Sequence, residues 1–285
     1  AARVVAGGME HMRMAPDDLE QARVGYRLGP GTMQDPLVHD GLWDVVYDFH
    51  MGLSNELWSE KYGVSREEQD RYAAESYQRA LKAIAAGHFD TEIVPVTIPS
   101  RKGAPTVFNK DECVRETPYE VLAKMKPAFK KEGTGTAGNA SIISDGAAAT
   151  VVMSRKKAEE LGCTVIASIG AQASYGIDMK YVLVAPIWAI PKCLAKEGLD
   201  IENVDLFEIN EAFSGSTVSV LKELQLDPAL VNVNGGSVAM GHPIGASGCR
   251  VLVTLLHEMI RQEKKTGVAS LCLGGGEAVA LVVKR

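Results

Sequence analysis

The sequence predicts an α/β protein, and three observations support that fold class. From Thr164 onward, short apolar runs alternate with amphipathic segments of helical period, a pattern typical of a sheet with helices on its faces. The 285 residues correspond to about two domains and suffice for a large apolar core. Hydrophobic residues make up 46% and charged residues 23%, close to the globular averages. The change to strand–helix alternation places a domain boundary near residues 155–163.

The first third of the chain has few predicted elements. Residues 3–6 form a short apolar run before two glycines, which predicts a strand already in progress at the first residue. Residues 11–39 lack periodicity, so we expect a surface excursion there. Ser65 and Glu68 form a capping-box pattern, and the amphipathic helix that they open should end at Gly87.

Three further segments lead to the boundary. Residues 93–98 contain Pro95, which restricts them to an edge strand. Residues 124–138 are basic and then rich in glycine and threonine. The segment GNASIISDGAAAT at 138–150 is expected to turn into a buried helix, because its small side chains allow close packing.

The C-terminal part alternates strands and helices. The predicted strands span 165–170, 204–209, 268–272 and 278–283. The predicted helices span 186–197, 213–224 and 247–260. The LGGGE connection between the last two runs predicts an antiparallel hairpin in the sheet interior. The residues expected to face inward from the second and third helices are Thr217, Val220, Leu221, Leu224, Leu252, Leu255, Leu256 and Met259.

Composition and charge exclude several classes of function. The net charge is −6, which offers no basic surface for nucleic acid or an acidic membrane. The longest apolar stretch, residues 182–191, is about half of the length that spans a bilayer. Five widely spaced cysteines fit neither a disulfide framework nor a metal site. The cysteine spacing leads us to expect no metal. No signal peptide is recognisable at the start, so we expect a cytoplasmic protein.

Three short segments place a reactive side chain just after a predicted strand or before a predicted helix: NEAF from Asn210, GHPIG around His242 and CLGGG from Cys272. Each has a structural alternative, since Asn210 could cap a helix, His242 could be a turn residue and Cys272 an inert core residue. The three glycines after Cys272 weaken the last alternative. They remove bulk beside the sulfur and expose backbone N–H groups, as an oxyanion hole requires.

Together, the three segments predict acyl transfer. A thiol, an imidazole, an amide and a cavity lined by glycine supply a nucleophile or acid/base, a proton acceptor and fixed dipoles. Nine of the 28 glycines lie between Gly235 and Gly276, which indicates close approach of the backbone to a ligand. Carbon–carbon chemistry on thioesters fits these groups especially well.

The sequence resembles the thiolase family of the acetyl-CoA acetyltransferase type, essentially from end to end. The resemblance implies a thiolase fold, a layered α-β-α-β-α core with an inserted loop domain. The segments that carry it are VVAGGME at Val4, DFHMG around His50, the capping-box helix, PAFKKEGTGTAGNASIISDGAAA from Pro127, INEAF from Ile209, NVNGGSVAMGHPIGASG from Asn232 and CLGGG from Cys272.

The resemblance implies a role for each reactive residue. Cys272 resembles the acid/base cysteine that removes the α-proton of the second acetyl-CoA and protonates the leaving enolate in thiolysis. His242 resembles the histidine that activates the nucleophilic cysteine and donates to a thioester oxygen. Asn210 resembles the asparagine that holds a water, which with His242 forms the oxyanion hole for the enolate. Gly274 is expected to offer its N–H to a second oxyanion hole.

The resemblance also implies that the substrate is a coenzyme A thioester, acetyl-CoA or acetoacetyl-CoA, with no separate cofactor. His50 and Met51 match the pair that contacts pantetheine, and the HMG segment resembles members that handle short acyl chains. Arg115 is expected near the nucleotide end, although its spacing to Phe129 differs by a residue from the family pattern. The residues expected to line the coenzyme A channel are Leu42, Phe129, Ala137, Ser141, Ala212 and Phe213.

One family feature has no match. The primary nucleophile of a thiolase is a cysteine in an N-terminal segment, and none of the cysteines in this sequence lies in such a context. We therefore expect that about a quarter of a whole thiolase is absent and that the chain as given is inactive. The expected organisation is a remnant of the N-terminal core domain at 1–11, an inserted coenzyme A-binding loop domain at 12–141, a return to the N-terminal core at 142–160 and a complete C-terminal domain at 161–285.

Two other functions are weighed against this one. A non-catalytic acyl-CoA-binding relative, or a subunit needing a partner chain, would have no physical need to keep Asn210, His242 and Cys272 together. A ketoacyl synthase is expected to have a second histidine where Cys272 stands, and His257 lies within a predicted helix as a surface residue. The family resemblance further implies fatty acid metabolism and a homotetramer built as a dimer of dimers.

Overall fold

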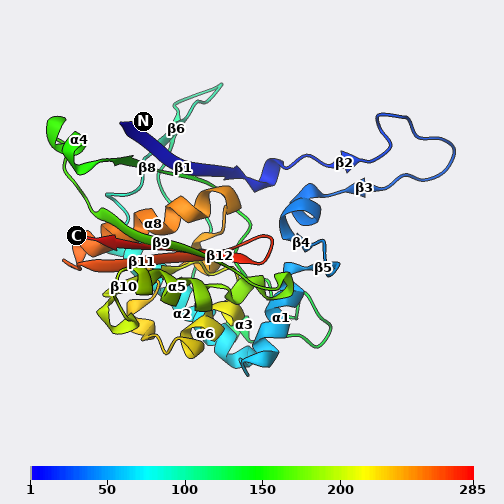
Figure 1. Cartoon of the computed structure of the whole chain (residues 1–285). Coiled ribbons are helices and arrows are strands. Elements are labelled where there is room, and N and C mark those ends of the chain that lie inside the picture. Colours follow the sequence, from blue (N-terminus) through cyan, green and yellow to red (C-terminus); the bar gives the residue numbers. More distant parts are fainter. Residues whose placement is uncertain (1) are drawn as a thin grey trace.

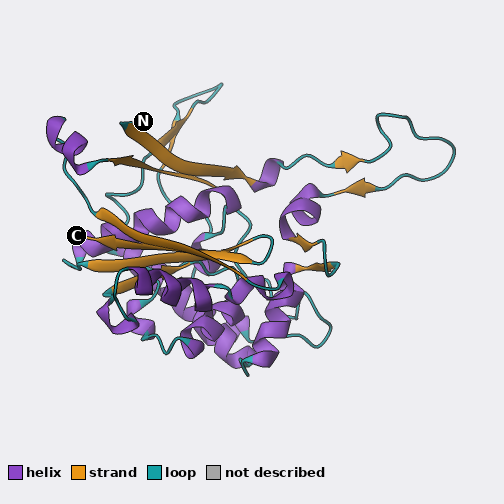
Figure 2. Ribbon diagram, in the orientation of Figure 1, coloured by secondary structure: helices purple, strands orange, loops and turns teal. Residues whose placement is uncertain are grey.

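The computed structural model describes residues 2–285, so the expectation that a strand is in progress at Ala1 lies outside the described residues. The main sheet has four strands in the order β10-β11-β12-β9 (Figures 1 and 2). Strand β10 runs parallel to β11, and the other pairs are antiparallel. The strands of this sheet are β9 (Ser168–Gly176), β10 (Leu206–Ile209), β11 (Thr266–Leu273) and β12 (Glu277–Lys284).

Helices cover both faces of this sheet, which confirms the predicted α/β class. Helix α5 (Pro186–Lys196) packs on β9 and β12, whereas α8 (Ile244–Arg261) packs on β10 and β11. One cluster of buried residues joins α8 to the sheet and consists of Leu206, Val251, Leu255, Met259, Ala269 and Val283. Close packing needs a glycine at β11, since a Cβ on Gly267 would lie 2.5 Å from the sulfur of Met259. The predicted final hairpin lies in the sheet interior, as expected.

A second, two-stranded sheet lies on the other side of α8. Strand β1 (Arg3–His11) pairs antiparallel with β8 (Asp145–Met153). Both strands differ from the prediction. The strand predicted at 3–6 continues through its two glycines, and the segment 138–150, predicted to turn into a buried helix, instead enters strand β8. A Cβ on Gly8 would lie 1.8 Å from the carbonyl oxygen of Gly245, so the small residues allow a strand, not a helix, to approach α8.

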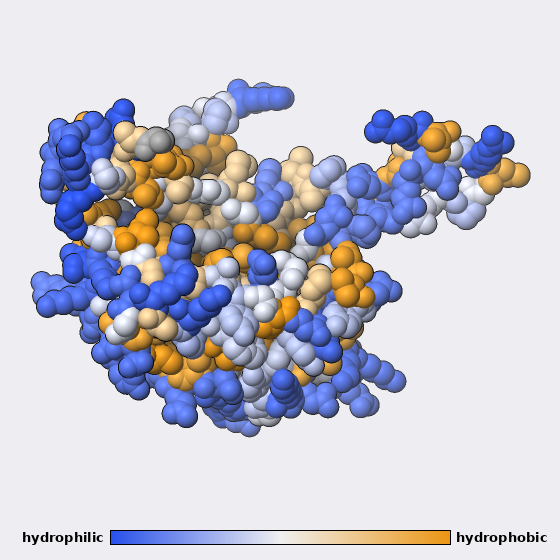
Figure 3. Space-filling view, in the orientation of Figure 1, coloured by the Kyte–Doolittle hydropathy of each residue, from blue (hydrophilic) through white to orange (hydrophobic). Residues whose placement is uncertain are grey.

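This ladder has one face toward α8 and one open face. Val5, Met9 and Val151 are exposed along it, and Figure 3 shows apolar side chains gathered there. The segment 12–50 leaves the body as an exposed excursion at 15–36, within the range 11–39 predicted for it, and returns to the body before His50 (Figure 1). Its elements are η1 (Met12–Met14), β2 (Asp18–Leu19), β3 (Met33–Gln34), the π-helical turn η2 (Leu37–Leu42), β4 (Trp43–Asp44) and β5 (Phe49–His50).

The capping-box helix is confirmed as α2 (Arg66–Ala85). Ser65 accepts from the backbone N–H of Glu68, whose side chain accepts in return from the backbone N–H of Ser65. The helix stops as predicted before Gly87, which has a φ of +72°. The predicted edge strand at 93–98 is the short β6 (Val96–Ile98), paired with β7 (Thr106–Phe108).

Most of the remaining helices complete the layer below the main sheet, whereas α4 lies on the other side, beside β8 (Figure 1). They are α1 (Met51–Lys61), α3 (Tyr119–Leu122), α4 (Arg155–Glu160), η3 (Met179–Val184), η4 (Ile201–Asn203), α6 (Ser214–Glu223), η5 (Pro228–Leu230) and α7 (Ser237–Met240). The strand predicted at 165–170 begins only at Ser168, because its pairing with β12 sets its length. No helix among residues 2–285 has the length and apolar character that a membrane span requires.

Candidate active site

The main sheet brings Asn210 and Cys272 to the same edge. Strand β10 ends at Ile209, which pairs with Ser270 of the parallel strand β11, and the Asn210 N–H donates to the Ser270 carbonyl over 3.0 Å. Cys272 is two residues further along β11. Ligand sites in α/β sheets form beyond the carboxyl ends of parallel strands, and both residues lie at such an end. Asn210 is not the cap of the next helix, since α6 takes Phe213 as its N-cap.

A turn between α7 and α8 adds His242. Gly241, with a φ of +100°, makes the turn, and the His242 N–H donates to the carbonyl of Ile142 over 2.8 Å. The Nε2 atom of His242 lies 3.2 Å from Nδ2 of Asn210, and Nδ1 lies 2.5 Å from the hydroxyl of Ser247. Both ring nitrogens are therefore occupied by polar partners, and the imidazole is held in one orientation.

Burial sets the protonation of the two ionisable groups. It lowers the pKa of His242 to about 4, with Arg250 adding to the effect, so the imidazole is neutral at pH 7. Burial raises the pKa of the Cys272 thiol to about 11. A neutral imidazole can accept a proton, and the protonated thiol can donate one. The pair therefore supplies a base and an acid.

The turn after Cys272 is shaped by glycine. Gly275 and Gly276 have φ values of +90° and +86°, which side chains rarely adopt. A Cβ on Gly276 would also lie 2.4 Å from the carbonyl of Ile177. Gly274 is exposed, and no atom lies within 4 Å of its Cβ position. Its backbone is thus accessible to a ligand, as an oxyanion donor must be.

Three aromatic residues predicted to meet coenzyme A lie together. The rings of His50 and Phe129 stack with centroids 5.2 Å apart, and Phe129 meets Phe213 edge-on at 5.5 Å. The Nδ1 atom of His50 accepts from the backbone N–H of Gly52, which leaves the proton of a neutral ring on Nε2. Burial lowers the pKa of His50, which favours this neutral form.

The other residues predicted to line the coenzyme A channel come from the loop before β8, the start of α1 and the turn η2. The Ser141 N–H donates to the carbonyl of Ala212 over 3.1 Å, so the loop before β8 lies along the NEAF segment. Met51 begins α1 and packs on the main core, and Ala137 is exposed on the same loop as Ser141. Leu42 ends the turn η2, where the Cβ position of Gly41 lies 3.8 Å from Ile244, two residues after His242.

Arg115 is the predicted site residue that the structure does not bring to this group. It is exposed and lies beside Tyr77 of α2, with the preceding Val114 packed on the cluster of buried residues around Tyr77. No hydrogen bond among residues 2–285 joins its side chain to His50, Phe129 or Ser141.

Two buried carboxylates that sequence reasoning missed hold the site's framework. Glu56 of α1 accepts from the backbone N–H groups of Thr134 and Gly135, at 2.8 to 2.9 Å. Glu211, next to Asn210, accepts from Tyr72 and Ser76 of α2 and from the Val238 N–H. In the sequence, Glu211 stands inside the NEAF segment directly after Asn210, and no local pattern indicates its structural role.

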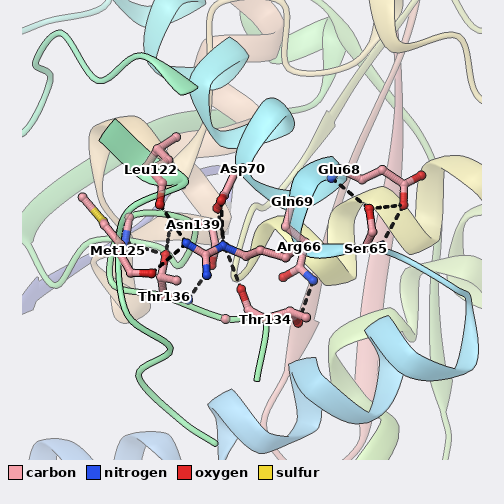
Figure 4. Close-up of polar contacts among 12 residues, drawn as sticks. Ser65, Arg66, Glu68, Gln69, Asp70, Leu122, Met125, Thr134, Thr136 and Asn139 are labelled. Carbon is pink, nitrogen blue, oxygen red and sulfur yellow. Dashed lines mark hydrogen bonds and ion pairs between the residues drawn. The ribbon is translucent and has the colours of Figure 1, made fainter. Parts of the chain in front are cut away.

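The start of α2 holds the loop that carries Phe129 and Ala137 (Figure 4). Arg66 donates to the carbonyls of Leu122 and Met125 at 2.7 and 2.9 Å. Asp70 accepts from the amide of Asn139 over 2.9 Å, and Gln69 donates to Thr134. The polar side chains of α2 thus fix the loop that carries Phe129 and Ala137.

The other four cysteines lie elsewhere. Cys193 is buried and its thiol donates to the carbonyls of Ala171 and Ala280, while Cys249 lies near the carbonyl of Ala6. Cys163 is exposed after α4, and Cys113 lies in the loop before Arg115. Among residues 2–285, no three His, Cys, Asp or Glu side chains form a group that could hold a metal ion.

Comparison with known proteins identifies relatives over the whole length. Two family models match, described as the thiolase N-terminal domain over residues 1–156 and the thiolase C-terminal domain over residues 163–285. An acetyl-CoA acetyltransferase of Pseudomonas aeruginosa is 52% identical over 283 residues, which cover 99% of this chain and 72% of that protein. A probable acetyl-CoA acyltransferase of Staphylococcus aureus is 50% identical with the same coverage.

Solved structures show the same likeness. The crystal structure of the Bacillus anthracis acetyl-CoA acetyltransferase matches with a TM-score of 0.96 at 45% identity, covering 100% of this chain and 72% of that one. Human mitochondrial 3-ketoacyl-CoA thiolase matches with a TM-score of 0.95 at 37% identity and the same coverage.

Proposed function

The chain belongs to the thiolase family, and from this premise we propose that its site supplies the proton-transfer and oxyanion groups for the reversible Claisen condensation of two acetyl-CoA molecules to acetoacetyl-CoA and free coenzyme A. The observation that carries the proposal is the meeting of the Asn210–His242 pair with the end of β11, where Cys272 stands. The names of the relatives support acetyl-CoA as the substrate.

In the proposed condensation, the Cys272 thiol first loses its proton to solvent, and the thiolate then takes the α-proton of acetyl-CoA. The resulting enolate carbon attacks the carbonyl of an acetyl group carried on a cysteine thioester, forming the carbon–carbon bond while the carbon–sulfur bond breaks. A water held by Asn210, together with His242 carrying a proton on Nε2, stabilises the enolate oxygen, and the N–H of Gly274 stabilises the oxygen of the tetrahedral intermediate. The high pKa of Cys272 supports this role, because a weakly acidic thiol gives a strongly basic thiolate.

We propose that pantetheine lies against His50 and Met51, along a channel formed by Leu42, Phe129, Ala137, Ser141, Ala212 and Phe213. The stacked and edge-on aromatic rings offer the apolar surface that such a chain needs. For Arg115 we keep the proposal of a contact at the nucleotide end, supported by its exposure. The proposed division is a loop domain at 12–141 between parts of the N-terminal core and a C-terminal domain at 161–285.

We propose that none of Cys113, Cys163, Cys193 and Cys249 accepts the acyl group, since none of their contacts involves Asn210, His242 or the turn after Cys272. The 285 residues by themselves are then inactive in the full condensation. They remain competent in the step that needs only Cys272 and the oxyanion donors, which is exchange of the α-protons of acetyl-CoA with solvent. A dimer of dimers is the proposed assembly, which light scattering would test.

The test is deuterium uptake into the acetyl group of acetyl-CoA in D2O, followed by mass spectrometry. The wild-type chain should exceed the uncatalysed rate, and Cys272→Ala should lower the protein-dependent rate by about 100-fold or more. Cys163→Ala, which alters an exposed thiol, is the matched control and should exchange as the wild type does. Calorimetry with coenzyme A should give the same affinity for all three proteins.

Two results would count against the proposal. Exchange that persists in Cys272→Ala would remove this residue from proton transfer. Tight binding of acetyl-CoA with no exchange in the wild type would favour the alternative, a non-catalytic acyl-CoA-binding relative.

A further inference from the structure

A chain of hydrogen bonds runs through the site from Arg250 to the carbonyl of Pro243. Arg250 Nη2 donates to the hydroxyl of Ser237 over 3.2 Å, and that hydroxyl donates to Oδ1 of Asn210 over 2.6 Å. The other end of the Asn210 amide meets Nε2 of His242. Beyond the ring, Nδ1 contacts Ser247, whose hydroxyl donates to the Pro243 carbonyl over 2.9 Å.

Arg250 and the Pro243 carbonyl, at the two ends of this series of hydrogen bonds, decide the direction of every hydrogen bond in the series. A guanidinium has no acceptor, so Ser237 must accept from Arg250 and use its own proton on Asn210. The Asn210 carbonyl oxygen is then engaged, and its NH2 group faces His242. At the far end a carbonyl can only accept, so Ser247 gives its proton to Pro243 and accepts from Nδ1 of His242. Reversing the direction would leave the Ser237 proton and the Pro243 carbonyl without these partners.

We propose that Ser237 and Arg250 are positioning residues that orient the Asn210 amide and thereby hold resting His242 in the tautomer protonated on Nδ1. The inference deepens the proposed function, on which it rests for the role of His242 at the enolate oxygen. With the proton on Nδ1, the lone pair of Nε2 faces Asn210, at the carboxyl end of β10. A proton taken up there converts the same atom into a donor for a thioester oxygen.

The surroundings of Arg250 support its role as a donor to Ser237. Glu208 of β10 is its nearest carboxyl group, with Nη1 and Oε2 3.7 Å apart. Burial raises the pKa of Glu208 to about 8, so this group is largely protonated at pH 7 and competes weakly for the guanidinium. Ser237 itself is fully buried, which excludes water as a replacement partner.

Nitrogen NMR of the imidazole tests the tautomer without any substrate. In the wild type, the His242 Nε2 signal should have the shift of an unprotonated ring nitrogen and Nδ1 that of a protonated one. In Ser237→Ala the amide loses the donor to its oxygen, and the ratio of the two tautomers should shift roughly fivefold toward protonated Nε2, as expected for one lost hydrogen bond. Ser237→Thr keeps a hydroxyl and should restore the wild-type spectrum.

Ser219→Ala is the matched control, because Ser219 is equally buried and its hydroxyl bonds only the Gly215 carbonyl in α6. This variant should leave the His242 signals unchanged. A wild-type His242 protonated on Nε2, or a Ser237→Ala spectrum identical to wild type, would overturn the inference. Neither outcome bears on Cys272, whose exchange assay decides the proposed function separately.

Discussion

Glu208 is buried on β10, two residues before Asn210, and faces one cation and three other carboxyl groups. Burial is the main cause of its raised pKa of about 8; Arg250 opposes this effect, while Glu211, Glu92 and Glu258 add to it. In the unfolded chain a glutamate titrates near a pKa of about 4.3. The native state therefore binds a proton that the unfolded state releases between these two values.

The sign of the resulting pH dependence follows from this difference. Stability from protonated Glu208 is fully present below about pH 4.3 and is lost as the pH rises toward 8. Glu208→Gln keeps the shape without the charge, so its stability relative to wild type should increase with pH across this window, by up to about 1.4 kcal/mol per pH unit. Urea unfolding of both proteins at several pH values measures the difference. A constant difference would show that Glu208 does not titrate as described.

At the scale of elements, the start of α1 and the loop that carries Phe129 are packed too closely for any side chain at Gly52. A Cβ at this position would lie 2.1 Å from the Phe129 ring. The same ring stacks on His50, the N-cap of α1. The glycine therefore joins helix and loop into one surface for the proposed pantetheine channel.

Gly52→Ala should displace the Phe129 ring and separate it from His50. We expect coenzyme A binding to weaken by roughly tenfold or more, within the usual 1–3 kcal/mol cost of overpacking. Calorimetry with coenzyme A measures the change. Gly176→Ala is the control, since no atom lies within 4 Å of its Cβ position and its φ is not positive. Equal affinity in both variants would contradict the proposed channel.

For the whole molecule, Glu211 joins helix α2 to the C-terminal part. Its carboxylate accepts from Tyr72 and Ser76 of α2 and also from Asn232 and Val238. One core cluster contains Trp58 of α1 together with residues of the main sheet. These shared contacts predict that the described chain unfolds as one cooperative unit.

Glu211→Ala should leave the hydroxyls of Tyr72 and Ser76 and the Val238 N–H without their acceptor, while Asn232 keeps the Ile209 carbonyl. We expect a loss of roughly 3 kcal/mol or more in the free energy of unfolding, because each buried group loses solvation without compensation. Circular dichroism in urea gives this value, and Glu277→Ala, at an exposed position on β12, should change it little. If Glu211→Ala proved as stable as that control, the carboxylate would not be the link between the two parts.

Local patterns were enough to predict the C-terminal strands and helices, the capping-box helix and the exposed excursion. They failed within residues 138–150, where the small residues from Asp145 onward form β8 because β1 and α8 require small partners. They failed again at Gly7 and Gly8, which continue β1. Pairing between segments far apart in the sequence decided both cases. Arg115 stayed apart from the aromatic group, since its position depends on packing around Tyr77.

The sequence by itself determined which reactive groups the protein carries, because Asn210, His242 and Cys272 each stand in a short motif whose turn residues are local. The tertiary structure alone decided how those groups are protonated and oriented. Burial lowers the pKa of His242 and raises that of Cys272. The bonds that direct the site join residues 32 positions apart from Asn210 to His242 and 27 apart from Asn210 to Ser237. Such contacts exist only once the sheet and α8 have packed.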